Sequence, residues 1–107
     1  MTVKQLSVND LQKKIARNEN IFLLDVREPN EFQYAHIANS TLIPLNQIPN
    51  RLTELDFKQE IIVVCHHGMR SQHAANYLIQ SGFENVSNLI GGIDAWSCNC
   101  DHSIPRY

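Results

Sequence analysis

Apolar residues form short continuous runs that recur along the chain. Residues 21–26 and 61–65 are the strongest runs, and the second is β-branched at its first four positions. Runs of this length are typical of strands that are buried on both faces of a parallel sheet. Shorter segments at 41–43 and 86–90 predict two further strands, and Pro44 stops the first of them.

Stripes of apolar residues at helical spacing lie between these runs. The clearest covers residues 71–80, where Ser71 is the expected N-cap and Gly82 the stop. Another helix is expected after Ser7, whose hydroxyl can cap the first turn. Shorter helices are expected at 30–34 (after Pro29), at 46–55 (with Pro49 near its start) and at 93–97. Strands that alternate with helices predict an α/β fold with a largely parallel sheet.

Composition narrows the class of protein. The 107 residues are the size of one domain, and 43% hydrophobic with 19% charged residues is near the globular average. Nine Lys and Arg against eleven Asp and Glu give a net charge of -2, so we expect no nucleic-acid partner. No apolar run is long enough for a membrane span, and the N-terminus has no apolar leader. These features lead us to expect a soluble, cytoplasmic protein. Because the chain has three cysteines, an odd number, at least one is expected to be a free thiol.

One cysteine stands where α/β folds place their sites. Cys65 ends the strand expected over 61–65, and a helix is expected to begin six residues later. Ligands of open α/β sheets bind outside the carboxyl ends of the strands. Gly68 permits a tight loop with inward N–H groups, the helix adds its positive end, and Arg70 adds a full charge. All three favour the thiolate, which is the nucleophilic form of cysteine.

Cys65 has a structural and a catalytic interpretation. A lone cysteine at a strand end is more often a small buried hydrophobic residue, but Gly68 and Arg70 in register with it favour a nucleophile. Tyrosine-type phosphatases place five residues between Cys and Arg, whereas four lie between Cys65 and Arg70. The smaller loop suits one sulfur atom better than a phosphoryl group.

Four segments of the chain resemble the pattern of single-domain rhodaneses, a family of sulfurtransferases. They are residues 24–29 (LDVREP) with 31–32, 36–37 with 43–45, 65–71 (CHHGMRS), and 82–86 with 89–96 (LIGGIDAW). The resemblance spans roughly residues 6–96. It implies a single rhodanese domain over 1–107, with 98–107 as a C-terminal tail. It also implies an α/β fold with a five-stranded, mainly parallel sheet and helices on both faces.

The resemblance implies a reaction as well. Cys65 would carry a persulfide, taking a sulfane sulfur from thiosulfate or another persulfide donor and passing it to a thiol or cyanide. Arg70 matches thiosulfate-type loops rather than mercaptopyruvate-type loops. The acceptor thiol could belong to a small redox protein. No cofactor is implied.

The residues around Cys65 are expected to bind the donor. These are His66, His67, Gly68, Met69, Arg70 and Ser71. The two histidines could tune the thiolate or contact an anion, although solvated loop histidines are the commoner case. The resemblance places Asp25 and Arg27 near the site as an ion pair that supports the loop. For Arg27 the alternative is a surface pair of little energetic weight.

Other functions remain open at this point. Cys98, Cys100 and His102 invite a metal site, but three candidates at this spacing do not make a structural zinc site, so we expect no metal. A redox role, with one of these thiols resolving the Cys65 persulfide, is a further alternative. A rhodanese-like binding module without catalysis is one rival to the enzyme. A phosphatase or arsenate reductase is the other, and the loop length disfavours it.

Overall fold

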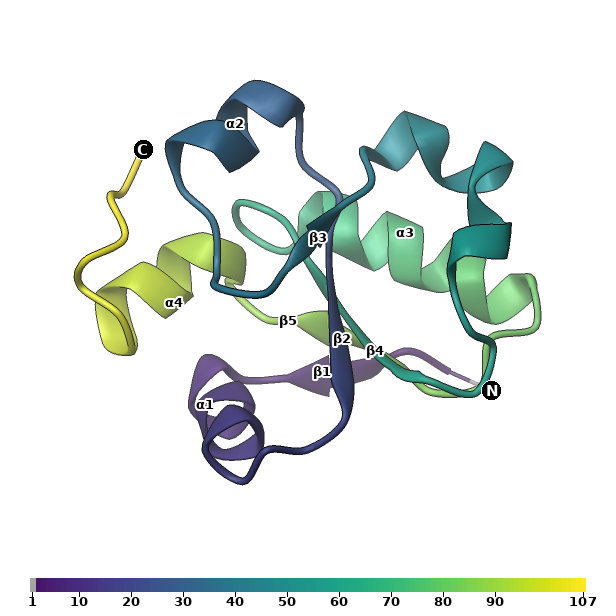
Figure 1. Cartoon of the computed structure of the whole chain (residues 1–107), viewed down its shortest axis with the longest axis horizontal. Helices are drawn as coiled ribbons and strands as arrows, with labels where there is room; N and C mark the ends of the chain where they lie inside the picture. The colour runs from purple at the N-terminus through teal and green to yellow at the C-terminus, as the bar shows by residue number, and fades with distance from the viewer. Residues whose placement is uncertain (1) are drawn as a thin grey trace.

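Five parallel strands form one sheet at the centre of the computed structural model, which describes residues 2–107 (Figure 1). The strands are β1 (Lys4–Leu6), β2 (Ile21–Asp25), β3 (Thr41–Leu42), β4 (Glu60–Val64) and β5 (Val86–Leu89), in the order β1-β5-β4-β2-β3. β4 pairs with β2 on one side and β5 on the other. The two apolar runs thus form the interior of the sheet, as parallel strands buried on both faces require.

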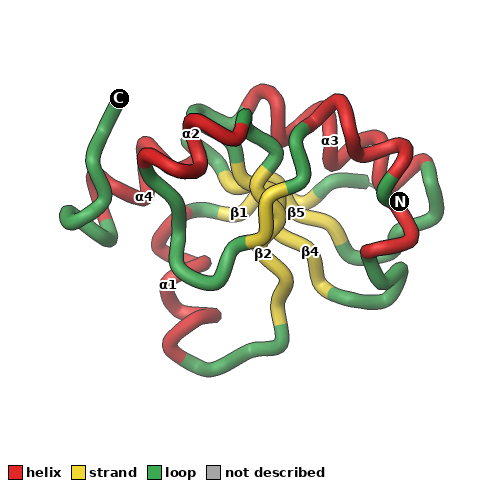
Figure 2. The backbone as a smooth tube through the Cα atoms, turned by 45° about the horizontal axis from the view of Figure 1, so that its top comes forward, coloured by secondary structure: helices red, strands yellow, loops and turns green. Residues whose placement is uncertain are grey.

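Helices cover both faces of the sheet (Figures 1 and 2). α1 (Val8–Ala16) and α4 (Gly92–Asn99) pack on one face, and α3 (Met69–Gln80) packs on the other with the 3-10 turns η1 (Leu45–Asn50) and η2 (Leu52–Glu54). α2 (Pro29–Tyr34) follows the carboxyl end of β2 directly. The expected α/β fold, with a parallel sheet and helices on both faces, is confirmed.

Two apolar clusters form the core, one on each side of the sheet. Alternate residues of β4 divide between them: Ile61 and Val63 face α3, while Ile62 and Val64 face α1 and α4. All four are essentially inaccessible to water. Because a strand points successive side chains to opposite faces, an apolar run with no polar interruption is what this double burial needs.

Several predicted elements are confirmed at their ends. Ser7 caps α1, accepting a hydrogen bond from the Asp10 amide at 3.1 Å. Pro29 begins α2, as expected from its fixed backbone angle. None of the helices within residues 2–107 is long and apolar enough to cross a membrane.

Two predictions need correction, and one strand has no prediction. β1 has no counterpart in the sequence patterns, because a three-residue edge strand is too short to show alternation. The helix expected over 46–55 is instead the pair of 3-10 turns, with Pro49 inside the first. Ser71 does not cap α3: Gly68 does, in the left-handed conformation (φ 110°), and the helix begins two residues before Ser71.

Candidate active site

The thiol of Cys65 lies at the carboxyl end of β4, at the start of the loop that leads into α3. Its Sγ atom accepts a hydrogen bond from the Gly68 amide at 3.0 Å and lies 3.2 Å from the Ser71 hydroxyl. The positive φ of Gly68 turns that amide back towards the sulfur. Only 1% of Cys65 is exposed to solvent.

A buried polar network lies behind the thiol. Ser71 is fully buried, and its hydroxyl donates to Asn88 Oδ1 at 2.5 Å; Asn88 in turn donates to Gln5 Oε1 at 3.1 Å. Since the single hydroxyl proton of Ser71 is used in this way, the hydroxyl accepts from the Cys65 thiol. When the thiol ionises, the hydroxyl must turn to donate to the sulfur. Ser71 therefore supports Cys65 from inside the protein.

Arg70 is held by a carboxylate from another part of the chain. Its guanidinium donates to both oxygens of Glu31, at 2.6 and 2.9 Å. This pairing lowers the pKa of Glu31 to about 2. The same hydrogen bonds raise the pKa of Arg70, and the nearby charge of Cys65 adds to the shift. Arg70 thus has a partner that the sequence patterns did not reveal, and its action on the thiolate and on a donor stays a prediction.

Asp25 and Arg27 form a buried ion pair. The guanidinium of Arg27 donates to the carboxylate of Asp25 at 2.7 to 3.1 Å and to the carbonyl of Ala35 at 2.6 Å. Both side chains are almost completely inaccessible. The surface-pair alternative for Arg27 is therefore wrong, and the pair ties the end of β2 to the chain that follows α2.

The other predicted donor-binding residues differ in their exposure. His67 is 64% exposed at its side chain, with Nδ1 4.0 Å from Asp94 Oδ2, and Met69 is 78% exposed. His66 is partly buried between the rings of His67 and Tyr107. Burial lowers the pKa of His66, and the neighbouring charge of His67 lowers it further. These effects favour the neutral imidazole of His66, and contact of these residues with a donor stays a prediction.

The start of α4 holds the other side of the loop. The amides of Ile93 and Asp94 donate to the carbonyls of Cys65 and His66 at 2.9 and 3.1 Å. A Cβ atom on Gly92 would lie 2.3 Å from the Cys65 carbonyl oxygen. The paired glycines, which the sequence predicts as a turn, are thus the point where helix and loop backbones meet.

The two remaining cysteines lie away from this loop. Cys98 and Cys100 are free and partly buried, and burial raises the pKa of Cys100. Among residues 2–107 no three His, Cys, Asp or Glu side chains gather in a way that could hold a metal ion.

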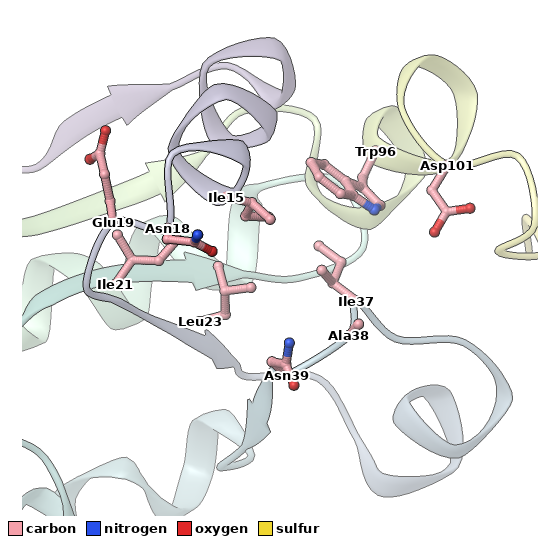
Figure 3. Close-up of a pocket in the computed structure, with 10 residues that line it drawn as sticks. All are labelled: Ile15, Asn18, Glu19, Ile21, Leu23, Ile37, Ala38, Asn39, Trp96 and Asp101. Atoms are coloured by element: carbon pink, nitrogen blue, oxygen red, sulfur yellow. The ribbon is translucent and has the colours of Figure 1, made fainter.

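A cavity of about 340 Å³ lies on the α1 and α4 side of the molecule (Figure 3). It is lined by Ile15, Asn18, Glu19, Ile21, Leu23, Ile37, Ala38, Asn39, Trp96 and Asp101. No residue of the Cys65 loop contributes to it. The candidate active site is therefore the loop itself and not this cavity.

Comparison with known proteins bears on this loop. The family model of the Rhodanese-like domain matches residues 7–99. The chain belongs to the rhodanese-like domain family. A "Thiosulfate sulfurtransferase GlpE" of Pseudoalteromonas translucida is 36% identical over 106 residues, which cover 99% of this chain and all of that protein.

Other relatives agree with this assignment. A protein named "Sulfurtransferase" of Allochromatium vinosum is 33% identical, covering 96% of this chain and 94% of its own length. The crystal structure of a rhodanese-like domain protein from Staphylococcus aureus superposes with a TM-score of 0.85 at 28% identity, covering 98% of this chain and 99% of that one. The comparisons support a rhodanese-type sulfurtransferase.

Proposed function

We propose that the protein is a thiosulfate-type sulfurtransferase with Cys65 as its nucleophile. The observation that supports this best is the setting of the Cys65 sulfur, which faces the Gly68 amide and the Ser71 hydroxyl at the carboxyl end of a central strand. The Gly68 amide already donates to the sulfur and stabilises negative charge on it, and the Ser71 hydroxyl adds a second donor once it turns from Asn88. The short loop disfavours the phosphatase alternative.

In the first half-reaction the Cys65 thiolate attacks the outer sulfur of thiosulfate. A bond forms between the two sulfur atoms while the S–S bond of thiosulfate breaks, and sulfite leaves with its electron pair. Charge balances: a thiolate and a thiosulfate dianion give the persulfide anion Cys65–S–S⁻ and a sulfite dianion. Cys65 then holds the intermediate covalently, which divides the transfer into two displacements.

In the second half-reaction an acceptor takes the terminal sulfur. Cyanide attacks that sulfur, the bond to Cys65 Sγ breaks, and thiocyanate leaves as the Cys65 thiolate re-forms. A thiolate acceptor reacts in the same way and leaves as a persulfide. We propose a thiol, such as one on a small redox protein, as the acceptor in a cytoplasmic setting.

Arg70 is proposed to bind the anionic end of the donor. Its planar guanidinium matches two oxygens of a sulfonate, as it matches the two oxygens of Glu31. The donor therefore competes with Glu31 for Arg70. His67 and Met69, the most exposed residues of the loop, lie at its solvent side for contact with donor or acceptor.

Steady-state transfer from thiosulfate to cyanide tests the proposal. Cys65→Ser should abolish thiocyanate formation, because serine cannot form a persulfide, while a far-UV spectrum confirms an intact fold. The double variant Cys98→Ser/Cys100→Ser is the matched control and should keep the wild-type rate. Turnover that survives in Cys65→Ser, or is lost in the control, would assign the nucleophile elsewhere. A wild-type protein without turnover would instead favour a binding module.

A further inference from the structure

The C-terminal tail is residues 100–107 and not the expected 98–107, because α4 continues to Asn99. It folds back from the end of α4 towards α2 (Figure 1). Ile104 is buried in the core on the α4 side, and its carbonyl accepts a hydrogen bond from the Ser97 hydroxyl. Arg106 pairs with Asp94 at 3.0 Å. These contacts fix the path of the tail and bring Tyr107 to the active-site loop.

The hydroxyl of Tyr107 lies between two charged groups of the site. It accepts a hydrogen bond from Arg27 at 2.7 Å and donates one to Glu31 Oε2 at 2.9 Å. The ring stacks on the imidazole of His66, with the ring centres 3.9 Å apart and the planes 5° from parallel. One side chain from the tail therefore contacts the buried ion pair, the partner of Arg70 and the residue next to Cys65.

Each oxygen of the Glu31 carboxylate has two donors. Oε1 accepts from the Glu28 amide and from Arg70, and Oε2 accepts from Tyr107 and from Arg70. If a donor anion draws Arg70 away, Tyr107 and the Glu28 amide still satisfy one lone pair on each oxygen. Without the Tyr107 hydroxyl, Oε2 would lose its only other donor within residues 2–107. Glu31 would then hold Arg70 more tightly, because a partly buried carboxylate is costly to leave unpaired.

We propose that Tyr107 is a positioning residue of the sulfurtransferase: its hydroxyl shares Glu31 with Arg70 and so lets Arg70 exchange from Glu31 to the sulfur donor. The ring also forms a wall of the site by covering His66. This inference rests on the proposed donor-binding role of Arg70. It makes the tail part of the active site, although the tail lies outside the motifs that carry the chemistry.

The test compares Tyr107→Phe, which keeps the ring and its stacking, with Tyr77→Phe, a matched control on α3 that touches no residue of the loop through its hydroxyl. Tyr107→Phe should lower kcat/KM for thiosulfate by about three- to tenfold, less than the loss of a charge-assisted hydrogen bond to the donor itself, because Tyr107 acts on the donor only through Glu31 and Arg70. Alkylation of Cys65 by neutral iodoacetamide, followed on the Cys65 peptide by mass spectrometry, should be unchanged. Tyr77→Phe should match the wild type in both assays.

A double-mutant cycle separates positioning from general damage. In a Glu31→Gln background, Tyr107→Phe should have little further effect, since the shared carboxylate is gone. The proposal would be overturned if Tyr107→Phe had the same kcat/KM for thiosulfate as Tyr77→Phe. It would also be overturned if Tyr107→Phe lowered kcat/KM by the same factor with glutamate and with glutamine at position 31.

A binding assay keeps this outcome distinct from failure of the proposed function. Sulfate, an unreactive analogue of the sulfonate end of thiosulfate, should protect Cys65 from iodoacetamide at constant ionic strength. Half-maximal protection of Cys65 in Tyr107→Phe should need a several-fold higher sulfate concentration than in the wild type. If this difference appears while the wild type transfers no sulfur, the proposed function fails and the role of Tyr107 in freeing Arg70 stands. If the wild type transfers sulfur but both proteins are protected by the same sulfate concentration, the role of Tyr107 is wrong and the proposed function stands.

Discussion

Arg70 binds Glu31 through Nη1 and Nη2, and under the proposed function the sulfonate end of the donor takes the place of Glu31. Such a donor replaces one charge-assisted pair with another. The net free energy of donor binding therefore depends on geometry more than on charge. A lysine keeps the charge but loses the planar fork. The side chain of Arg70 is 37% exposed, which leaves it room to move.

Arg70→Lys should lower kcat/KM for thiosulfate by about ten- to a hundredfold, the equivalent of one charge-assisted hydrogen bond. The alkylation rate of Cys65 by a neutral reagent should change much less across the pH range. Arg51→Lys, on a partly exposed arginine that also pairs with a glutamate, is the control. Equal losses in both assays would mean that Arg70 mainly stabilises the thiolate, and no loss in either would remove its donor-binding role.

Ser71→Ala should reduce the free energy of unfolding by about 1–3 kcal/mol, because it leaves Asn88 Oδ1 buried without a donor. Urea unfolding measures this, with Ser103→Ala at an exposed position as the control. A Ser71→Ala protein as stable as the wild type would show that the network behind the thiol carries no stability.

Sequence spacing identified the residues that are close together in the chain, and missed those that are not. Cys65, Gly68 and Arg70 lie within one loop, so their relation is visible in the sequence. Glu31 reaches Arg70 from 39 residues away, and Tyr107 reaches Glu31 from 76. Asn88 gave a weak signal, a polar residue within a strand that is otherwise buried. Its partner Ser71 becomes apparent only when α3 is packed against β5.

Among the elements, α4 holds one side of the loop in place. Its first amides hold the carbonyls of Cys65 and His66, and Gly92 lets the two backbones approach. The apolar runs predicted the strands that carry this arrangement. They could not predict the docking of α4, which depends on the absence of a side chain at one position.

Gly92→Ala should destabilise the protein and reduce sulfur transfer, since its Cβ would lie 2.3 Å from one loop carbonyl and 2.5 Å from the next. Gly82→Ala is a matched control with a positive φ but no atom closer than 3.8 Å. We expect Gly92→Ala to cost about 2 kcal/mol more than the control in urea unfolding, from overpacking against backbone. Equal losses of unfolding free energy in the two variants would mean that α4 and the Cys65 loop can move apart without cost.

At the scale of the whole molecule, Glu31 links α2, α3 and the tail through Arg70 and Tyr107. The pKa of Glu31 is lowered from its ordinary value of 4.5 to about 2, first by the hydrogen bonds from Arg70. A carboxyl whose pKa is depressed by folding adds stability above its unfolded pKa, and this stability is lost as the pH falls through the folded pKa. The contribution should therefore be complete near pH 5 and disappear towards pH 2.

Glu31→Gln should flatten the acid limb of the stability curve, lowering the free energy of unfolding by about 1–3 kcal/mol at pH 6 and by little at pH 2. Thermal unfolding from pH 2 to 7 measures the difference. Glu84→Gln, on an exposed glutamate, should leave the curve unchanged. If the free energies of unfolding of Glu31→Gln and the wild type differed by the same amount at every pH, the ion pair would not be the source of the difference.

The central claim is that Cys65 carries the sulfur in transit, and mass spectrometry tests it most directly. The reduced protein is incubated with thiosulfate in the absence of an acceptor, desalted and mapped by peptide. We predict one added sulfur atom on Cys65, one equivalent of sulfite released, and loss of the added sulfur on treatment with cyanide. An unchanged mass, or the added sulfur on Cys98 or Cys100, would contradict the account.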